Sequence, residues 1–178
     1  ETKSPQEMLD EAMNQMKAKL SDDLMEEIMK ITWAEFEQLV VQLLIKMGYG
    51  PLHFNQDAVT KKTGDEGIDG IVTADKLGFD SIYVQAKQWK TDATVAKPEI
   101  QKFVGALMTH GGTKGIFITT AKFSSGAIEE SKKLPSPKIV LVDGKRLAEL
   151  MIEYNLGVTT VQTYEVKRVD SDFFNEDV

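Results

Sequence analysis

The sequence predicts an α/β domain in which a mixed central sheet is flanked by helices, with further helices at the N-terminus. Two observations support this fold class. Apolar residues recur with helical spacing up to about residue 47, and with a period of two from about Leu52 to Trp89. Beyond Trp89, helical and strand-like segments alternate, which is typical of a sheet with helices on both faces.

Two helices are expected before residue 32. Ser4-Pro5-Gln6-Glu7 has the pattern of a helix N-cap, with proline in the first turn and glutamate three residues after the cap. Ser21-Asp22-Asp23 is expected to restart a second, shorter helix. We assign residues 1–31 to a helical linker or support segment without chemistry, and residues 32–178 to the main domain.

The next helix has a complete start signal at Thr32. Thr32 and Glu35 have the spacing of a capping box, and Ile31 and Phe36 that of a hydrophobic staple. An apolar stripe follows, and Gly48 ends the helix. The stripe consists of Phe36, Leu39, Val40, Leu43, Leu44 and Met47.

The remaining elements are separated by glycine, aspartate and proline turn signals. Strands are expected at Ala58–Thr63, Ile68–Thr73, Ser81–Trp89, Gly115–Thr120 and Lys138–Val142. Helices are expected from Pro98 to the Gly111-Gly112 stop, at Ser124–Lys133 and at Asp143–Asn155. A last strand-like stretch, Thr163–Val169, precedes an acidic end that is expected to fray.

Composition narrows the possible chemistry. The chain has 178 residues, 42% of them hydrophobic, and no cysteine, so disulfides, thiolate nucleophiles and cysteine-based zinc sites are excluded. With only His53 and His110, any metal would be a hard, oxygen-ligated ion such as Mg²⁺. No apolar run approaches the roughly 20 residues of a membrane helix, and a cytoplasmic location is expected.

The net charge of −7 argues against DNA binding, because non-specific affinity comes mostly from lysine and arginine at phosphates. Two features soften the objection. Bound divalent ions would neutralise acidic groups, and a separate DNA-reading domain could supply basic surface. A chain that begins at Glu1 is expected to be a piece of a longer protein.

The strand Ser81–Trp89 has one apolar face and one unusual face. Because side chains alternate, residues 82, 84 and 86 pack on the core. Gln85 and Lys87 are neighbours on the other face, roughly 7 Å apart along the strand. A lysine beside an amide in mid-strand is a candidate for catalysis. The alternative is a solvated face on which Lys87 extends its charge to water.

Asp69 lies inside a β-run, between Ile68 and Ile71. Aspartate is depleted in strands and costly to bury without a partner. A metal ion, or Lys87 on the adjacent strand, would satisfy it. The alternative is a turn aspartate, an interpretation that fits Asp65 better.

Glu37 is the third candidate. It lies on the margin of the apolar stripe, and capping explains Glu35 but leaves Glu37 without a local role. The alternative is a partly buried glutamate on the helix flank that pairs with a lysine.

In this order, these residues resemble the PD-(D/E)xK nuclease superfamily, and specifically the Mrr-like restriction endonuclease catalytic domain. The resemblance covers nearly the whole chain. It rests on the blocks FEQLVVQLL, GDEGIDGIV, VQAKQW, KPEIQKFVGAL, KGIFITT, FSSGAIEESKKL and KIVLVDGKRLAELMIEYNLGV.

The resemblance implies a restriction-endonuclease-like sheet with the active site at one edge. The metal-binding aspartate of the family corresponds to Asp69, its strand motif to Gln85 and Lys87, and its helix glutamate to Glu37. Asp69, Gln85 and Glu37 would hold Mg²⁺ or Mn²⁺. The superfamily more often has glutamate where Gln85 stands, and Mrr-like members often carry glutamine.

The implied activity is metal-dependent hydrolysis of DNA phosphodiester bonds by an activated water, in type IV-like restriction of foreign or methylated DNA. Cutting both strands needs two active sites, so a dimer or higher homo-oligomer is expected on the DNA. Mrr members commonly join this domain to an N-terminal winged-helix domain, and no such domain is visible in these residues.

Three alternatives remain at this stage. A catalytically silent DNA-binding domain of the same fold is favoured by Gln85 and by the net charge. A protein-interaction domain would use Asp69 and Lys87 as a simple cross-strand ion pair. A junction resolvase would differ in the shape of its substrate rather than in its chemistry.

Overall fold

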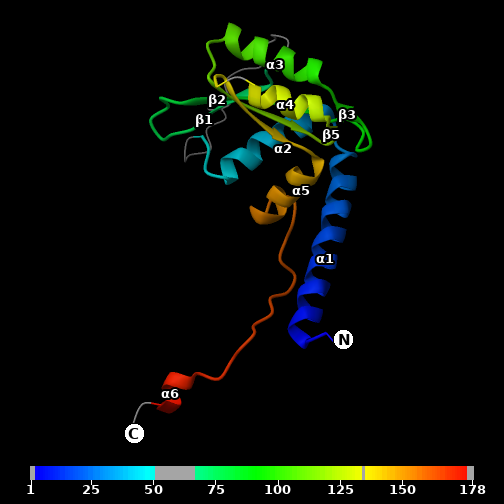
Figure 1. Cartoon of the computed structure of the whole chain (residues 1–178), viewed down its shortest axis with the longest axis vertical. Helices are drawn as coiled ribbons and strands as arrows, with labels where there is room; N and C mark the ends of the chain where they lie inside the picture. The colour runs from blue at the N-terminus through cyan, green and yellow to red at the C-terminus, as the bar shows by residue number, and fades with distance from the viewer. Residues whose placement is uncertain (1–2, 51–66, 134, 176–178) are drawn as a thin grey trace.

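The computed structural model describes residues 3–50, 67–133 and 135–175 (Figure 1). The helices are α1 (Pro5–Ile28), α2 (Trp33–Lys46), α3 (Lys97–Thr109), α4 (Ser125–Lys133), α5 (Gly144–Glu153) and α6 (Ser171–Asn175). The strands are β1 (Gly70–Thr73), β2 (Ser81–Lys87), β3 (Thr94–Val95), β4 (Lys114–Thr119), β5 (Lys122–Phe123) and β6 (Lys138–Val142).

The main sheet has four strands in the order β1-β2-β4-β6. β1 runs antiparallel to β2, whereas β2, β4 and β6 are parallel to one another. This is the predicted mixed sheet, and the predicted fold class is confirmed. The predicted strand Ala58–Thr63 lies outside the described residues. A small parallel ladder of β3 and β5 was not predicted.

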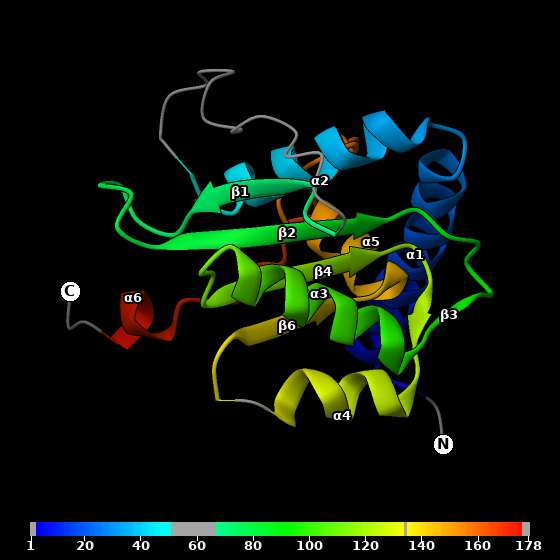
Figure 2. The same cartoon turned by 90° about the horizontal axis from the view of Figure 1, so that it is seen from above.

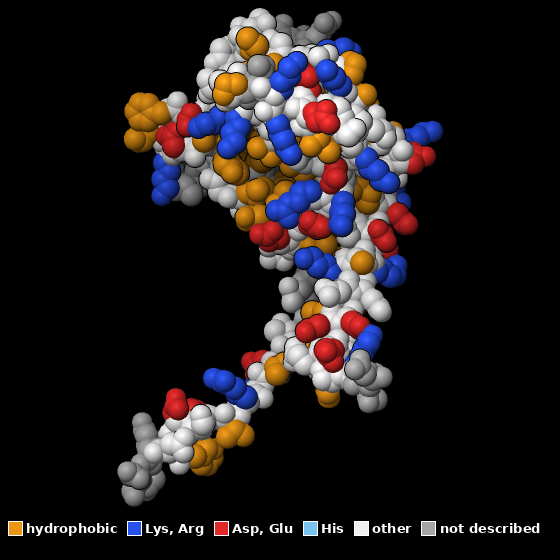
Figure 3. All heavy atoms as spheres, in the orientation of Figure 1, with side chains coloured by type: hydrophobic (Ala, Val, Ile, Leu, Met, Phe, Trp, Pro, Cys, Tyr) orange, Lys and Arg blue, Asp and Glu red, His pale blue; other side chains and the backbone are white. Residues whose placement is uncertain are grey.

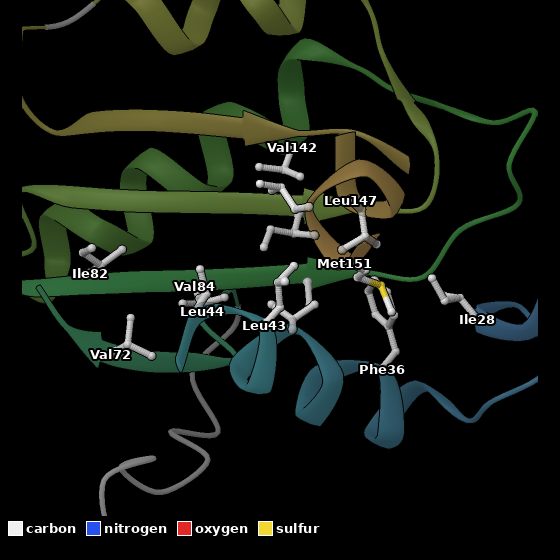
Figure 4. Packing of buried hydrophobic residues seen from close by; sticks show 14 of the residues in the cluster. Ile28, Phe36, Leu43, Leu44, Val72, Ile82, Val84, Val142, Leu147 and Met151 are labelled. Atoms are coloured by element: carbon white, nitrogen blue, oxygen red, sulfur yellow. The ribbon is translucent and has the colours of Figure 1, made fainter. Parts of the chain in front are cut away.

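Helices cover both faces of the sheet, as Figure 2 shows. On one face, buried residues of α1, α2 and α5 form a single hydrophobic cluster with the sheet (Figure 4). On the other face, α3 and α4 bury a second cluster around Phe103 and Phe117. Each face of β2 therefore looks into a different core.

The predicted restart at Ser21-Asp22-Asp23 is wrong, because α1 is one helix of 24 residues. Serine and aspartate often start helices, because their side chains can hydrogen-bond to nearby backbone groups. They are also tolerated inside a helix at a small cost in stability. Here Leu24 and Ile28 continue into the core and hold the helix in register. The capping boxes at Ser4 and at Thr32 with Glu35 are both present, as predicted.

The predicted strand-like stretch Thr163–Val169 forms no strand in the structure. A strand needs a neighbouring strand for its backbone hydrogen bonds, and no described segment lies beside it. The following residues, expected to fray, form the short helix α6. Among residues 3–50, 67–133 and 135–175, every helix is too short or too polar to cross a bilayer.

Candidate active site

Asp69 immediately precedes β1 and is fixed against the middle of β2. Its backbone N–H donates to the Val84 carbonyl at 2.8 Å. Its Oδ2 accepts two hydrogen bonds of 2.7 Å, from the backbone N–H of Ala86 and from Nε2 of Gln85. The antiparallel pairing of β1 with β2 places Asp69 there, because Gly70 pairs with Val84.

Gln85 is buried, with 3% of its surface exposed. It lines a pocket of about 690 Å³ under α3, together with Lys87 and Gly67. Gly67 has φ of +117°, a conformation that favours glycine, and an added Cβ there would lie 3.6 Å from Oε1 of Gln85. Gly67, in the GDEGIDGIV block, thus allows this backbone conformation beside the Gln85 amide, a role that the sequence did not reveal.

Glu37 and Lys87 complete the cluster around Asp69. The Glu37 side chain, from α2, hydrogen-bonds with the Asp69 carboxyl, and Lys87 attracts it electrostatically. Burial is the largest influence and raises the pKa of Asp69, against the lowering effects of the Ala86 N–H, Lys87 and Glu37. Glu37 and Lys87 thus lie close enough to Asp69 to act on its carboxyl group.

The structure therefore brings together all four residues that the sequence singled out: Asp69, Gln85, Lys87 and Glu37. Gln85 and Lys87 lie on β2, Asp69 directly precedes β1, and Glu37 lies on α2. Asp69 and Lys87 are close enough to interact electrostatically, as a shared site requires.

Two threonines that the sequence analysis missed hold the end of β2 at Lys87. Thr119 is fully buried, and its hydroxyl donates to the Lys87 carbonyl at 2.8 Å. The backbone N–H of Thr120 donates to the same carbonyl at 3.2 Å. The signal available was two consecutive threonines at the end of an apolar strand, but only the pairing of β2 with β4 gives them a partner.

Gln88 ties the same end of β2 to the N-terminal helix. Its Nε2 donates to the carbonyls of Ile28 and Ile31, at 2.8 and 2.9 Å. These carbonyls lie at the C-terminal end of α1, where backbone acceptors lack partners within the helix. The catalytic candidates thus lie on a strand end that is fixed from two directions.

Charged and polar residues at the ends of α3 have structural roles. Lys97 pairs with Glu130 at 3.4 Å, and Glu99 pairs with Lys102 at 3.0 Å. His110, one of the two histidines of the chain, is the C-cap residue of α3.

The residues present fit a hard divalent cation. Within the described part of the chain, no group of three or more acidic or histidine side chains could hold a metal by itself. Mg²⁺, however, is usually bound by one or two carboxylates together with substrate phosphates and water. Asp69 and Glu37 supply two carboxyl groups in contact, and Gln85 supplies an amide beside them.

A mixed sheet that positions an acidic pair and a lysine at one edge defines a domain of the restriction endonuclease class. Residues 28–151 match the model of the Mrr_cat family, described as restriction endonuclease. The chain belongs to this family, and the predicted resemblance is confirmed.

Two similar proteins are longer than this chain. It is 39% identical over 171 residues to the type IV methyl-directed restriction enzyme EcoKMrr of Escherichia coli (strain K12). That match covers 96% of this chain and 54% of the relative. It is 26% identical over 137 residues to the uncharacterized protein y4cE of Sinorhizobium fredii (strain NBRC 101917 / NGR234), covering 75% of this chain and 30% of that protein. The chain thus spans about half, or less, of the length of these relatives.

A solved structure shares the fold. The DNA modification-dependent restriction endonuclease AspBHI superposes with a TM-score of 0.58 over 78% of this chain and 36% of its own, at 16% sequence identity. At this identity the similarity concerns the fold alone, and it supports the restriction-endonuclease-like architecture predicted from the sequence.

Proposed function

We propose that this chain is the catalytic domain of a metal-dependent endonuclease that hydrolyses DNA phosphodiester bonds in the restriction of foreign or methylated DNA. The observation that carries the proposal is the convergence of Glu37, Gln85 and Lys87 on the half-buried carboxyl of Asp69. The 39% identity to a type IV methyl-directed restriction enzyme supports the assignment to DNA.

Asp69 and Glu37 would hold Mg²⁺ or Mn²⁺, and Gln85 would either add its amide oxygen or orient Asp69, to which it donates a hydrogen bond. The bound ion would supply Lewis-acid stabilisation of the phosphate and a more acidic water. Since Gln85 is uncharged, the negative charge around the ion would come from the two carboxylates and the scissile phosphate.

Lys87 would act on the substrate rather than on the ion. It lines the pocket next to Gln85, and its backbone is held by Thr119. From this position its ammonium group would position the attacking water or stabilise the negative charge that develops on the phosphate. Because the end of β2 is fixed, this charge would be positioned before the substrate arrives.

The test is Mg²⁺-dependent nicking of a supercoiled plasmid by the wild type and by Lys87→Ala. We expect the variant to lose about 10²- to 10³-fold in rate, as for removal of one preorganised charge-stabilising group. Lys145→Ala, on the exposed side of α5, is the matched control and should cut like the wild type. Circular dichroism verifies that each protein is folded. A Lys87→Ala protein that nicks at the wild-type rate would eliminate the mechanism.

A catalytically silent nucleic-acid-binding domain is the second candidate, favoured by the uncharged Gln85. It predicts DNA binding without nicking in Mg²⁺ or Mn²⁺. Calorimetry with Mn²⁺ before and after Asp69→Ala tests a further possibility, because a simple ion pair of Asp69 with Lys87 binds no metal. Comparing a four-way junction with a linear duplex would identify a junction resolvase.

We further propose that the enzyme works in the cytoplasm as a dimer or higher homo-oligomer, joined to an N-terminal winged-helix domain that reads the DNA. The greater length of the relatives supports the additional domain. We retain residues 32–178 as the catalytic domain and residues 1–31 as its support. Since Leu24 and Ile28 enter the main core, the end of this support is packed against the catalytic domain.

A further inference from the structure

The outer edge of β6 is open for strand pairing. β6 ends the four-stranded sheet, and the described residues contain no strand on its outer side. The Lys138 N–H donates to the Thr113 carbonyl, next to β4. In a parallel ladder, the backbone groups of alternate residues hydrogen-bond to the strand on one side and then to the strand on the other. The backbone N–H and C=O groups of Ile139 and Leu141 therefore point away from β4, toward the open edge. Val140 is 46% exposed. An open apolar edge of this kind is a template for another strand.

A groove of about 630 Å³ runs beside this edge, between β6, α4 and the start of α5. Its apolar lining includes Phe123, Ile128, Ile139 and Leu141. Its charged residues are three basic ones, Lys122, Lys132 and Arg146, and one acidic one, Asp143. Figure 3 shows apolar side chains bordered by lysine and arginine on the side of the molecule where α4 faces the viewer. The groove therefore suits an apolar segment that carries acidic residues.

The C-terminal tail is such a segment. It leaves α5 and extends away from the body (Figure 1). Thr163–Val169 has the alternation of a strand but no strand partner among the residues that the structure describes. Tyr164 and Val166 share one face and are 58% and 74% exposed. Glu165 and Lys167 pair on the opposite face, 3.3 Å apart. Acidic residues follow, including Asp170 and Asp172.

We propose that Thr163–Val169 of one copy of this chain adds as a strand to the outer edge of β6 in a second copy. Tyr164 and Val166 fill the groove, and Asp170 and Asp172 lie beside its basic residues. Backbone pairing supplies affinity, and the apolar side chains supply specificity. A second copy is the occupant because the tail points away from its own body, and reciprocal exchange closes a two-fold dimer.

The absence of cysteine makes a crosslinking test direct. Val140→Cys in one chain is mixed with Glu165→Cys or Lys167→Cys in a chain that carries a size tag, and the mixture is oxidised. Residues 165 and 167 would share the sheet face of Val140, whereas residue 168 would lie on the other face. We expect a disulfide-linked heterodimer with 165 or 167 and much less with Arg168→Cys. Equal crosslinking at all three positions would overturn the proposal.

Sedimentation velocity supplies the second measurement. The double variant Tyr164→Asp, Val166→Asp should raise the dimer dissociation constant at least tenfold, and Thr163→Asp, on the other tail face, should change it little. Two results overturn the proposal: an unchanged constant for the double variant, or a disulfide that forms only within a single chain bearing both cysteines. The β6 edge and the tail are remote from Asp69. A protein that nicks DNA but forms no crosslink would overturn this inference alone. A protein that forms the crosslink but does not nick DNA would overturn only the proposed cleavage.

Discussion

The two faces of β2 differ in burial and in chemistry. On one face, Val84 and Ala86 are each 1% exposed and pack among residues of α2 and α5. On the other face, Gln85 is 3% exposed yet donates a hydrogen bond to Asp69. The seven residues of β2 thus have two separate roles. The apolar face packs in the core and fixes the strand, and the polar face carries the candidate catalytic residues. The two functions should therefore separate by mutation.

The largest expected effect is on the polar face. Asp69→Asn keeps the size of the side chain but removes the carboxylate, and we expect plasmid nicking to fall by about 10³-fold, as for the loss of a central charged group. Asp80→Asn, whose carboxylate pairs with Lys114 away from the site, is the control and should leave the rate within a factor of two or so. Initial rates at saturating Mg²⁺ measure both. Comparable losses in the two variants would contradict the assignment.

The apolar face should show the reverse behaviour. Val84→Ala removes two buried methyl groups and should lower the free energy of unfolding by about 2–3 kcal/mol, with the rate per folded molecule unchanged. Urea denaturation and nicking assays on the same preparation measure the two quantities. If the folded fraction of Val84→Ala cut DNA much more slowly than the wild type, the two faces would not be separable.

A smaller effect is expected where β4 supports Lys87. Thr119→Val keeps the shape but leaves the Lys87 carbonyl with one donor fewer, and we expect about a tenfold lower kcat with little change in KM. Thr119→Ser should restore most of the rate, because it restores the hydroxyl. A rise in KM with unchanged kcat would assign Thr119 to substrate binding instead.

The smallest effect concerns pH and the metal-free protein. Burial raises the pKa of Asp69 above its unfolded value, so its contribution to stability is present at low pH and is lost as the pH rises through the folded pKa. Without metal, Asp69→Asn should therefore melt above the wild type at about pH 8, and the two should converge towards about pH 4. Added Mg²⁺ should stabilise only the wild type. A difference in melting temperature that is constant with pH would exclude this explanation.

Much of this site could be predicted because its signals are local. Alternation in one strand identified Gln85 and Lys87, an aspartate inside a β-run identified Asp69, and the margin of a helical stripe identified Glu37. All four are near one another in the structure. Most of the helices and strands after residue 67 also lie within one to three residues of their predicted bounds.

The features that could not be predicted depend on segments distant in sequence. The contact of Thr119 with Lys87 exists only because β2 and β4 are parallel neighbours, 32 residues apart along the chain. The continuity of α1 past Ser21 depends on contacts of Leu24 and Ile28 with the rest of the core. The strand-like pattern of Thr163–Val169 is real in sequence, but a pattern cannot show whether a pairing partner exists in the same chain.

The unbroken course of α1 has a mechanical consequence. Its 24 residues give a rod of about 36 Å, close to one turn of duplex DNA, about 34–36 Å. Only its last turns are buried, at Leu24 and Ile28, so the rest projects from the body as Figure 1 shows. Under the arrangement proposed above, a DNA-reading domain joined rigidly to the far end of α1 would be held at a set spacing from the catalytic residues. α1 would then set a fixed distance between the place where the DNA is read and the place where it is cut.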